Sequence, residues 1–333
     1  MTSKERVYKA LQFDKPDRVP VDIWMLPAVE ERYGKALEEL VARRNIDVVK
    51  APFHDPTADA QMYDAGIHHD IWGCEWHSHK AGMAGEVKGY PLEKNENFEK
   101  YRSPVYLLEK IDESEFRKGT QEYLDKHSDK FVYGGWISLF ERMQFLRGTE
   151  ELYVDIALES DEFFLLRDMV LKYWLCYADL VSQTPGVDAC IIGDDWGSQK
   201  SLLISPEAWR KLFKPAYKQI IDRIRSNGKL VFVHSDGYIL DLYKDWIELG
   251  VSAINSQVWC MGVDAVAKET HGKITCWGEL SRQSTLPFGT PEDILREVAE
   301  MKEKLSCNGG LIGQCEVGCD VPLINIETAL FAW

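Results

Sequence analysis

The feature that most constrains the fold is an alternation of short β-rich segments with amphipathic helical segments along the whole chain. Strands that alternate with helices pair in parallel through right-handed crossovers, and eight such units close into a barrel. The sequence therefore predicts an α/β fold, a (β/α)8 TIM barrel. An open doubly wound sheet is the alternative, but no glycine-rich phosphate loop follows an early strand. The eight β-rich segments are residues 19–24, 46–53, 131–137, 189–195, 230–236, 252–258, 274–280 and 309–315.

The helical segments have recognisable starts and stops. Ser205-Pro206-Glu207 and Thr290-Pro291-Glu292 each place a capping hydroxyl before a proline and an acidic first turn. Residues 151–183 form an amphipathic segment of 33 residues, which predicts two consecutive helices. Residues 63–92, rich in Gly, His and Trp, break the alternation. We expect a single domain over residues 1–333, with 63–92 as an inserted hairpin or loop over the barrel mouth.

Charge and composition narrow the classes of function. The chain of 333 residues has 39 basic and 54 acidic residues, a net charge of −15, which argues against nucleic acid or an anionic membrane as the partner. No apolar run approaches the roughly 20 residues of a membrane helix, and the charged start has no signal-peptide pattern. Eight cysteines are too dilute for a disulfide scaffold. These features predict a cytoplasmic enzyme with reduced thiols.

Polar residues end most of the predicted strands, which is where TIM barrels carry their catalytic groups. His234 and Asp236 end the fifth strand two residues apart, so their side chains point to the same side. The eighth strand brings Cys315 to the same mouth, with Cys319 one short turn beyond. A histidine with one or two thiolates suits a zinc ion. The alternative is that Cys315 packs as a small apolar residue and His234 is a hydrogen-bonded core residue.

Other strand ends add candidate catalytic and binding residues. Asp194 and Asp195 can act on substrate or orient a metal ligand, or else serve as a helix cap or ion pair. Glu279 can face the pocket, and Arg282 can hold an anionic group or pair with Glu279. We expect the substrate to contact Trp24, Trp136, Trp196, Gln257 and Arg282. The histidines of residues 63–92 are more typical of an exposed surface than of a metal site.

Ordered motifs over nearly the whole chain resemble the uroporphyrinogen decarboxylase superfamily, and more closely its methyltransferase branch. The start "RVYKALQFDKPDRVPVDIW" resembles the N-terminal signature, and "YGGWISLFERMQFLRGTEELYVDI" resembles the glycine-rich stretch before a long helix. The central block, the fifth strand and the C-terminal motifs follow in the order of the family: "PGVDACIIGDDWGSQKSLLISPEAWRKLFKPAYKQII", "GKLVFVHSDG", "WGELSRQSTLPFGTPEDI" and "GGLIGQCEVGCDVPLINIETAL". The fold of that family is a (β/α)8 barrel.

The resemblance implies a zinc site. The methyltransferase branch binds zinc through His-x-Cys on the fifth strand and a cysteine near the C-terminus, which correspond to His234 and Cys319. Asp236 stands where the branch has its first cysteine, and the third ligand is Asp236, Cys315 or Glu316. An aspartate makes a harder site than a thiolate, which favours activation of an oxygen substrate over a thiol.

The resemblance also implies the reaction and its partner. We expect a zinc-dependent methyltransferase that acts with a corrinoid-binding protein, with O-demethylation of a methoxylated compound favoured over methylation of a thiol. The aromatic residues near strand ends suit an apolar or aromatic substrate, and a homodimer is expected for the family. Decarboxylation of a tetrapyrrole is disfavoured, because no arginine lies between Arg18 and Arg32. Two alternatives remain: a metal-free lyase and a non-catalytic barrel subunit.

Overall fold

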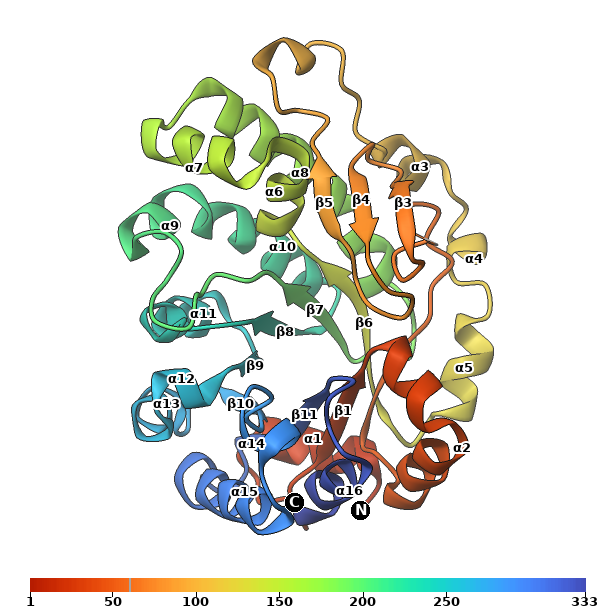
Figure 1. Ribbon diagram of the computed structural model, residues 1–333, viewed down its shortest axis with the longest axis vertical. Helices are drawn as coiled ribbons and strands as arrows, with labels where there is room; N and C mark the ends of the chain where they lie inside the picture. The colour runs from red at the N-terminus through yellow and green to blue at the C-terminus, as the bar shows by residue number, and fades with distance from the viewer. Residues whose placement is uncertain (60) are drawn as a thin grey trace.

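The predicted barrel is present in the computed structural model, which describes residues 1–59 and 61–333 (Figure 1). Eight strands form one sheet in the order β1-β11-β10-β9-β8-β7-β6-β2, and every pairing is parallel. The main-chain amide of Asp47 donates to the carbonyl of Val21 at 2.9 Å, which joins β1 to the start of β2. The sheet therefore closes into a nearly complete (β/α)8 barrel. Its strands are β1 (Val21–Met25), β2 (Val48–Lys50), β6 (Phe131–Ile137), β7 (Ala189–Gly193), β8 (Leu230–Ser235), β9 (Ala253–Ser256), β10 (Thr275–Glu279) and β11 (Leu311–Val317).

Each of the eight predicted strands matches an observed one, and β8, which carries His234, is the fifth strand of the barrel. The second strand is shorter than predicted: it ends at Lys50, although the sequence indicated 46–53. Ala51 still donates to the carbonyl of Tyr133 at 2.8 Å, but Pro52 has no amide hydrogen to continue the pairing. Pro52 therefore ends β2 at the point where this strand reaches the open end of the barrel.

Helices form the outer layer around the barrel (Figure 1). The segment 151–183 is divided between α7 and α8, as predicted, because Glu159 adopts a left-handed conformation and Ser160 caps the second helix. The helices are α1 (Ser3–Leu11), α2 (Pro27–Arg44), α3 (Val105–Lys110), α4 (Glu113–Phe116), α5 (Thr120–Lys126), α6 (Phe140–Arg147), α7 (Thr149–Leu158), α8 (Asp161–Ser182), α9 (Pro206–Leu212), α10 (Lys214–Ser226), α11 (Tyr243–Leu249), α12 (Val258–Met261), α13 (Val263–Thr270), α14 (Thr285–Phe288), α15 (Pro291–Leu305) and α16 (Leu323–Ala332), with short 3-10 turns η1 (Asn95–Asn97) and η2 (Leu240–Leu242).

The barrel interior is a packed apolar core. Aromatic rings from several strands meet there: Phe131 stacks on Phe232 with 5.4 Å between ring centroids, and Phe232 meets Trp277 edge-on at 5.1 Å. Residues at alternate strand positions join a second, larger core between the sheet and the helices. The side on which a strand residue lies is thus set by its position along the strand.

The inserted segment 63–92 forms a separate antiparallel sheet of β3 (Gly66–His69), β4 (Glu75–Ser78) and β5 (Glu86–Gly89) in that order (Figure 1). Trp72 packs edge-on against Tyr173 of α8, and Trp76 packs against Phe145 of α6. The carbonyl of Gly82 accepts from the amide of Ala28 at 3.2 Å, just beyond β1. The insertion therefore lies at the rim of the barrel mouth, which is the end where the carboxyl ends of the barrel strands meet. No described helix is both long and apolar enough to cross a bilayer.

Candidate active site at the barrel mouth

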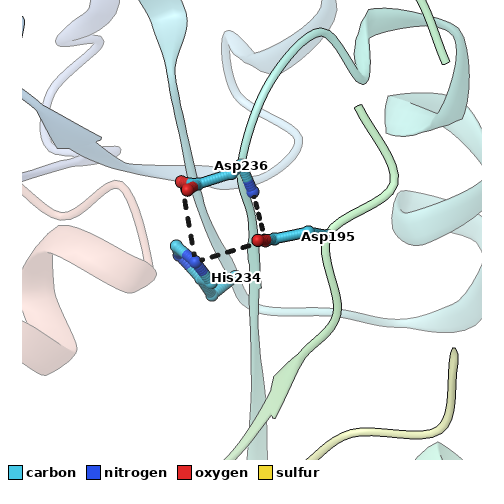
Figure 2. Close-up of side chains that lie close together, drawn as sticks. All are labelled: Asp195, His234 and Asp236. Carbon is cyan, nitrogen blue, oxygen red and sulfur yellow. Dashed lines mark hydrogen bonds and ion pairs between the residues drawn. The ribbon is translucent and has the colours of Figure 1, made fainter. Parts of the chain in front are cut away.

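Three side chains from neighbouring strand ends gather at the mouth: Asp195 after β7, and His234 and Asp236 at the end of β8. Their ligand atoms all lie within 4.8 Å of one another. Nε2 of His234 is 3.6 Å from Oδ1 of Asp195 and 3.7 Å from Oδ1 of Asp236 (Figure 2). The main-chain amide of Asp236 also donates to Asp195 at 2.8 Å, which fixes the two strand ends together (Figure 2). We call Asp195, His234 and Asp236 the mouth triad.

The tautomer of His234 is set by Asn255 at the end of β9. Nδ2 of Asn255 donates to the carbonyl of Trp277 at 2.7 Å, so its Oδ1 is the atom that faces Nδ1 of His234, at 2.6 Å. Nδ1 therefore carries the hydrogen and donates it. In the neutral ring, Nε2 is left with a lone pair that points toward two carboxylate oxygens.

Such an arrangement requires a positive charge between the three groups. Burial alone would lower the pKa of His234, but Asp195 and Asp236 raise it overall, and burial together with Asp236 raises the pKa of Asp195. Oδ1 of Asp236 is buried and has no hydrogen-bond partner among the described residues. A proton on Nε2 or a divalent cation would relieve the repulsion, and the separation of the ligand atoms fits a cation. A histidine with two carboxylates is a ligand set that zinc and other divalent metals accept.

Arg282 lies among three carboxyl side chains beside His234. We call these side chains, Asp236, Glu279 and Glu316, the acidic wall. The guanidinium of Arg282 pairs with Oδ2 of Asp236, lies 2.5 Å from Oε2 of Glu316 and lies 3.6 Å from Glu279. Of the two alternatives for Arg282, the ion pair with the site's own carboxylates is the one present. Asp236 therefore offers one oxygen to Arg282 and keeps the other free toward His234.

Glu279 ends β10 and is buried, with Oε2 lacking a partner among the described residues. Burial has the largest effect and raises the pKa of Glu279, whereas the charge of Arg282 lowers it. The resulting pKa is about 8. Glu279 is thus a carboxylic acid that keeps its proton at neutral pH. Such a group can donate a proton to a reacting oxygen.

Asp194 has a different role from its neighbour Asp195. It accepts hydrogen bonds from Ser138 Oγ, from the amides of Leu139 and Glu141, and from Tyr217 Oη, at 2.7–3.0 Å. Burial nevertheless raises its pKa to about 6. Asp194 holds the β6–α6 turn in place and has no oxygen free for substrate.

Two tryptophans predicted to contact substrate lie against His234. Trp24 is 5.2 Å and Trp136 is 5.4 Å from the imidazole, centroid to centroid. Gly193 makes this possible, because a Cβ on that residue would lie 2.4 Å from the indole of Trp136. Trp196 is elsewhere: it is buried against Phe140 in the core between sheet and helices, and its Nε1 donates to Tyr217. The expectation that Trp196 contacts substrate is therefore not supported, since its ring faces away from the mouth.

Gln257, also predicted to contact substrate, is buried beside β9 and accepts a hydrogen bond from Gln199 Nε2 at 2.5 Å. The pair links the loop after β7 to the end of β9. Its side chain has a protein partner and supports that loop.

The two cysteines predicted as metal ligands do not join the triad. Cys315 lies at an outward position of β11 and packs in the core between sheet and helices, where burial raises its pKa far above the usual range. Its neighbours Gln314 and Glu316 occupy the inward positions, since strand side chains alternate. Cys319 lies in the loop after β11, with Sγ 3.7 Å from Sδ of Met83 in the insertion. Asp195, which the sequence did not assign as a metal ligand, lies beside His234 and Asp236 instead.

Glu141 is a site residue that the sequence did not indicate. It is the second residue of α6, is shielded beside Asp194 and Asp195, and has an oxygen 3.1 Å from Ser138 Oγ. Burial first, then Asp195 and Asp194, raise its pKa well above the ordinary value. The only sequence signal was its place one turn after a barrel strand, at the end where such folds carry function.

The fold and the polar mouth define a TIM-barrel protein with a candidate metal site. The family model for uroporphyrinogen decarboxylase (URO-D) matches residues 2–330, and the chain belongs to that family. A solved methyltransferase from Methanosarcina mazei is similar in fold, with a TM-score of 0.71, 17% identity, and coverage of 100% of this chain and 98% of that one. The 3-keto-D-glucoside 4-epimerase YcjR from E. coli is less similar, with a TM-score of 0.41, 13% identity, and coverage of 73% of this chain and 93% of that one. No curated protein sequence matches the chain significantly.

Proposed function

We propose that this chain is a metal-dependent methyltransferase of the URO-D family that acts with a corrinoid-binding protein. The observation that carries the proposal is the mouth triad, in which Nε2 of His234 faces two carboxylates and Oδ1 of Asp236 has no hydrogen-bond partner among the described residues. Family membership and the fold shared with a solved methyltransferase support the same class. We infer a divalent ion, zinc in the first instance, held by Asp195, His234 and Asp236.

The ligand chemistry favours an oxygen substrate. Two carboxylates and an imidazole form a harder and less electron-donating set than thiolates. When bound, zinc would serve as a Lewis acid toward the ether oxygen of a methoxy group. The proposed reaction is O-demethylation, in which the methyl group passes from the ether oxygen to Co(I) of a corrinoid and the oxygen leaves as an alcohol or phenol.

The side chains of the mouth supply the remaining requirements. The leaving oxygen needs a proton, and Glu279 holds one at neutral pH because burial raises its pKa to about 8. Trp24 and Trp136 provide apolar surfaces next to His234 for the carbon skeleton of the substrate. Asn255 keeps the imidazole in the tautomer that presents Nε2.

A spectroscopic assay tests the proposal. The purified chain is incubated with zinc, a panel of methoxylated aromatic compounds and cob(I)alamin in place of the protein-bound corrinoid, and the conversion of Co(I) to methyl-Co(III) is followed by absorbance. We expect a rate above that of cob(I)alamin alone, lost with chelator and lowered at least about a hundredfold in His234→Ala, since removal of a ligand removes the site.

The matched control is Cys315→Ala, which changes a buried residue of β11 outside the triad. It is expected to keep the wild-type rate. The absence of methyl transfer with zinc, manganese or ferrous iron would contradict the proposal. Release of CO2 from a carboxylated substrate, unaffected by chelator, would instead identify a metal-free lyase.

A further inference from the structure

Lys50 has a position in the barrel mouth that the triad does not explain. It is the last residue of β2, two places after Val48, which belongs to the core inside the barrel. Its Nζ lies over the indole of Trp136, 5.6 Å from the ring centroid. Trp136 in turn lies 5.4 Å from the imidazole of His234. Lys50, Trp136 and the triad are therefore arranged in sequence along one path across the mouth.

Lys50 reaches solvent at the barrel mouth and has protein close around it. The side chain is exposed to solvent, and yet the protein around it lowers its pKa by desolvation. Within residues 1–59 and 61–333, no charged group or hydrogen bond contributes to that shift, and desolvation is the sole cause. By contrast, Arg282 lies against the carboxyl groups of Asp236, Glu279 and Glu316. Among the described residues, Lys50 is thus a cation without a counter-charge.

The strand order places this cation opposite the acidic wall. β2 is at one end of the sheet order, next to β6, and meets β1 where the barrel closes. In the closed ring, the strands across from β2 are β9 and its neighbours β8 and β10, which carry Asp236 and Glu279. A ligand in the mouth would thus meet a lone positive charge on one side and the reacting groups on the other.

We propose that Lys50 binds the carboxylate of the methyl donor, and that the donor is a methoxylated aromatic acid. Its ring would lie against Trp136 and Trp24, with the methoxy group toward the mouth triad. A lysine ammonium at the barrel mouth gains most from an anionic partner, because a neutral ligand that covered it would leave it desolvated and without a counter-charge. This inference rests on the proposed function for the identity of the methoxy end, whereas the anionic end rests on Lys50 alone.

Calorimetric titration with matched probes tests the inference without any turnover. The probes are 4-methoxybenzoate and 4-methoxybenzamide, which differ in charge and have the same ring and methoxy group. We expect the wild-type chain to prefer the benzoate, and Lys50→Met to weaken benzoate binding at least about tenfold while benzamide binding changes less than about twofold. Lys50→Arg, which keeps the charge, should bind the benzoate within about threefold of wild type.

The control variant is Lys218→Met, on the exposed face of α10, which should bind both probes as the wild type does. Thermal unfolding verifies that Lys50→Met is folded, as expected for a side chain that makes no hydrogen bond or ion pair with the described residues. Equal loss of both probes in Lys50→Met, no loss of either, or a wild-type chain that binds neither or prefers the amide would overturn the inference. Charge-selective binding without methyl transfer to cob(I)alamin would remove the proposed function and leave the anion site standing. Demethylation of 4-methoxybenzoate at the same rate by the wild type and by Lys50→Met would do the reverse, since it would support the proposed function and remove the anion site.

Discussion

The orientation of His234 depends on a single amide side chain. Asn255 accepts the Nδ1 hydrogen and is itself held by the carbonyl of Trp277 and by Gln314 Oε1, at 2.7 and 3.3 Å. Residues that orient a metal-bound imidazole usually contribute about tenfold to a hundredfold to metal affinity. We predict that Asn255→Ala weakens zinc binding by about that factor in a calorimetric titration, because the ring loses both its tautomer and its fixed plane.

The neighbouring residue supplies the control for Asn255. Ser256→Ala also removes a buried hydrogen bond, the 2.6 Å contact with Tyr243 Oη, but on the opposite side of β9. It should lower stability by about 1 kcal/mol and leave zinc affinity unchanged. Equal effects of the two substitutions on zinc affinity would show that Asn255 acts only through stability.

At the residue scale, the sequence indicated part of the site and missed part for identifiable reasons. His234 and Asp236 could be paired from their spacing, because alternate strand residues share a side. The same rule places Cys315 outward only once the inward side of β11 is known. The sequence does not show that side, because "LIGQCEV" is almost uniformly buried and has no alternation of apolar and polar residues. Asp195 lies beyond the end of β7, where strand alternation no longer applies, and its contact with His234 is made between strands.

The packing of β6 on β7 shows how one glycine positions the mouth. The indole of Trp136 crosses Gly193, where a Cβ would lie 2.4 Å from two ring carbons. We predict that Gly193→Ala lowers the free energy of unfolding by about 2 kcal/mol, since overpacking displaces a large ring. The displaced Trp136 should also weaken binding of the methoxybenzoate probe. Chemical denaturation and calorimetry measure the two effects.

Gly278→Ala is the matched substitution on β10. Its added Cβ would meet Cε of Met301 at 2.6 Å, the flexible end of a side chain on the outer face of the barrel. We expect a smaller loss, about 0.5–1 kcal/mol, and unchanged ligand binding, because Met301 can move aside. A larger effect from Gly278→Ala than from Gly193→Ala would contradict the assigned role of Gly193.

Helices and strands could be predicted wherever the residues that start or end them are close together in the sequence. The helices after Ser205 and Thr290 begin as predicted, with serine and threonine side chains accepting from the third helical amide. The loop that carries Cys319 was not predictable in the same way. Its position depends on contacts with residues distant in the sequence, Met83 in the insertion and Arg32 of α2, which donates to the Cys319 carbonyl.

At the scale of the whole molecule, closure of the barrel depends on Asp47. This buried carboxylate accepts from Arg6, from Arg18 and from the amide of Val21, at 2.6–3.0 Å, where β1 meets β2. Burial alone would raise the pKa of Asp47, but these partners lower it overall. A carboxylate whose pKa is lowered by folding stabilises the fold above its unfolded pKa, near 4, and that contribution is lost as the pH falls through the folded pKa.

We predict that Asp47→Asn lowers the free energy of unfolding at pH 7 by about 3 kcal/mol, because two arginines lose their buried partner. The difference from wild type should shrink below about pH 4, where the wild-type carboxylate also gains a proton. Urea denaturation across this range measures it, with Asp64→Asn on the exposed insertion as the control. A difference that stays constant with pH would show that the charge of Asp47 does not contribute.

The barrel itself could be predicted from the sequence because its eight strands alternate with helices, a pattern that few other folds satisfy. The path of the insertion could not be predicted from the sequence. Its histidines suggested an exposed hairpin. In the structure, Trp72 and Trp76 are buried against α8 and α6, and Asp70 pairs with Arg142 at 2.8 Å. These contacts join parts of the chain that no local pattern connects.

The most direct test of the account is the metal content of the purified chain and of three variants. Elemental analysis after loading with zinc and removal of the excess should find about one ion per chain in the wild type and in Cys319→Ala, and close to none in His234→Ala or Asp236→Ala. That result would place the ion at Asp195, His234 and Asp236. Less than ~0.2 ion per wild-type chain, unrestored by added metal, or an ion that depends on Cys319 and not on Asp236, would contradict it.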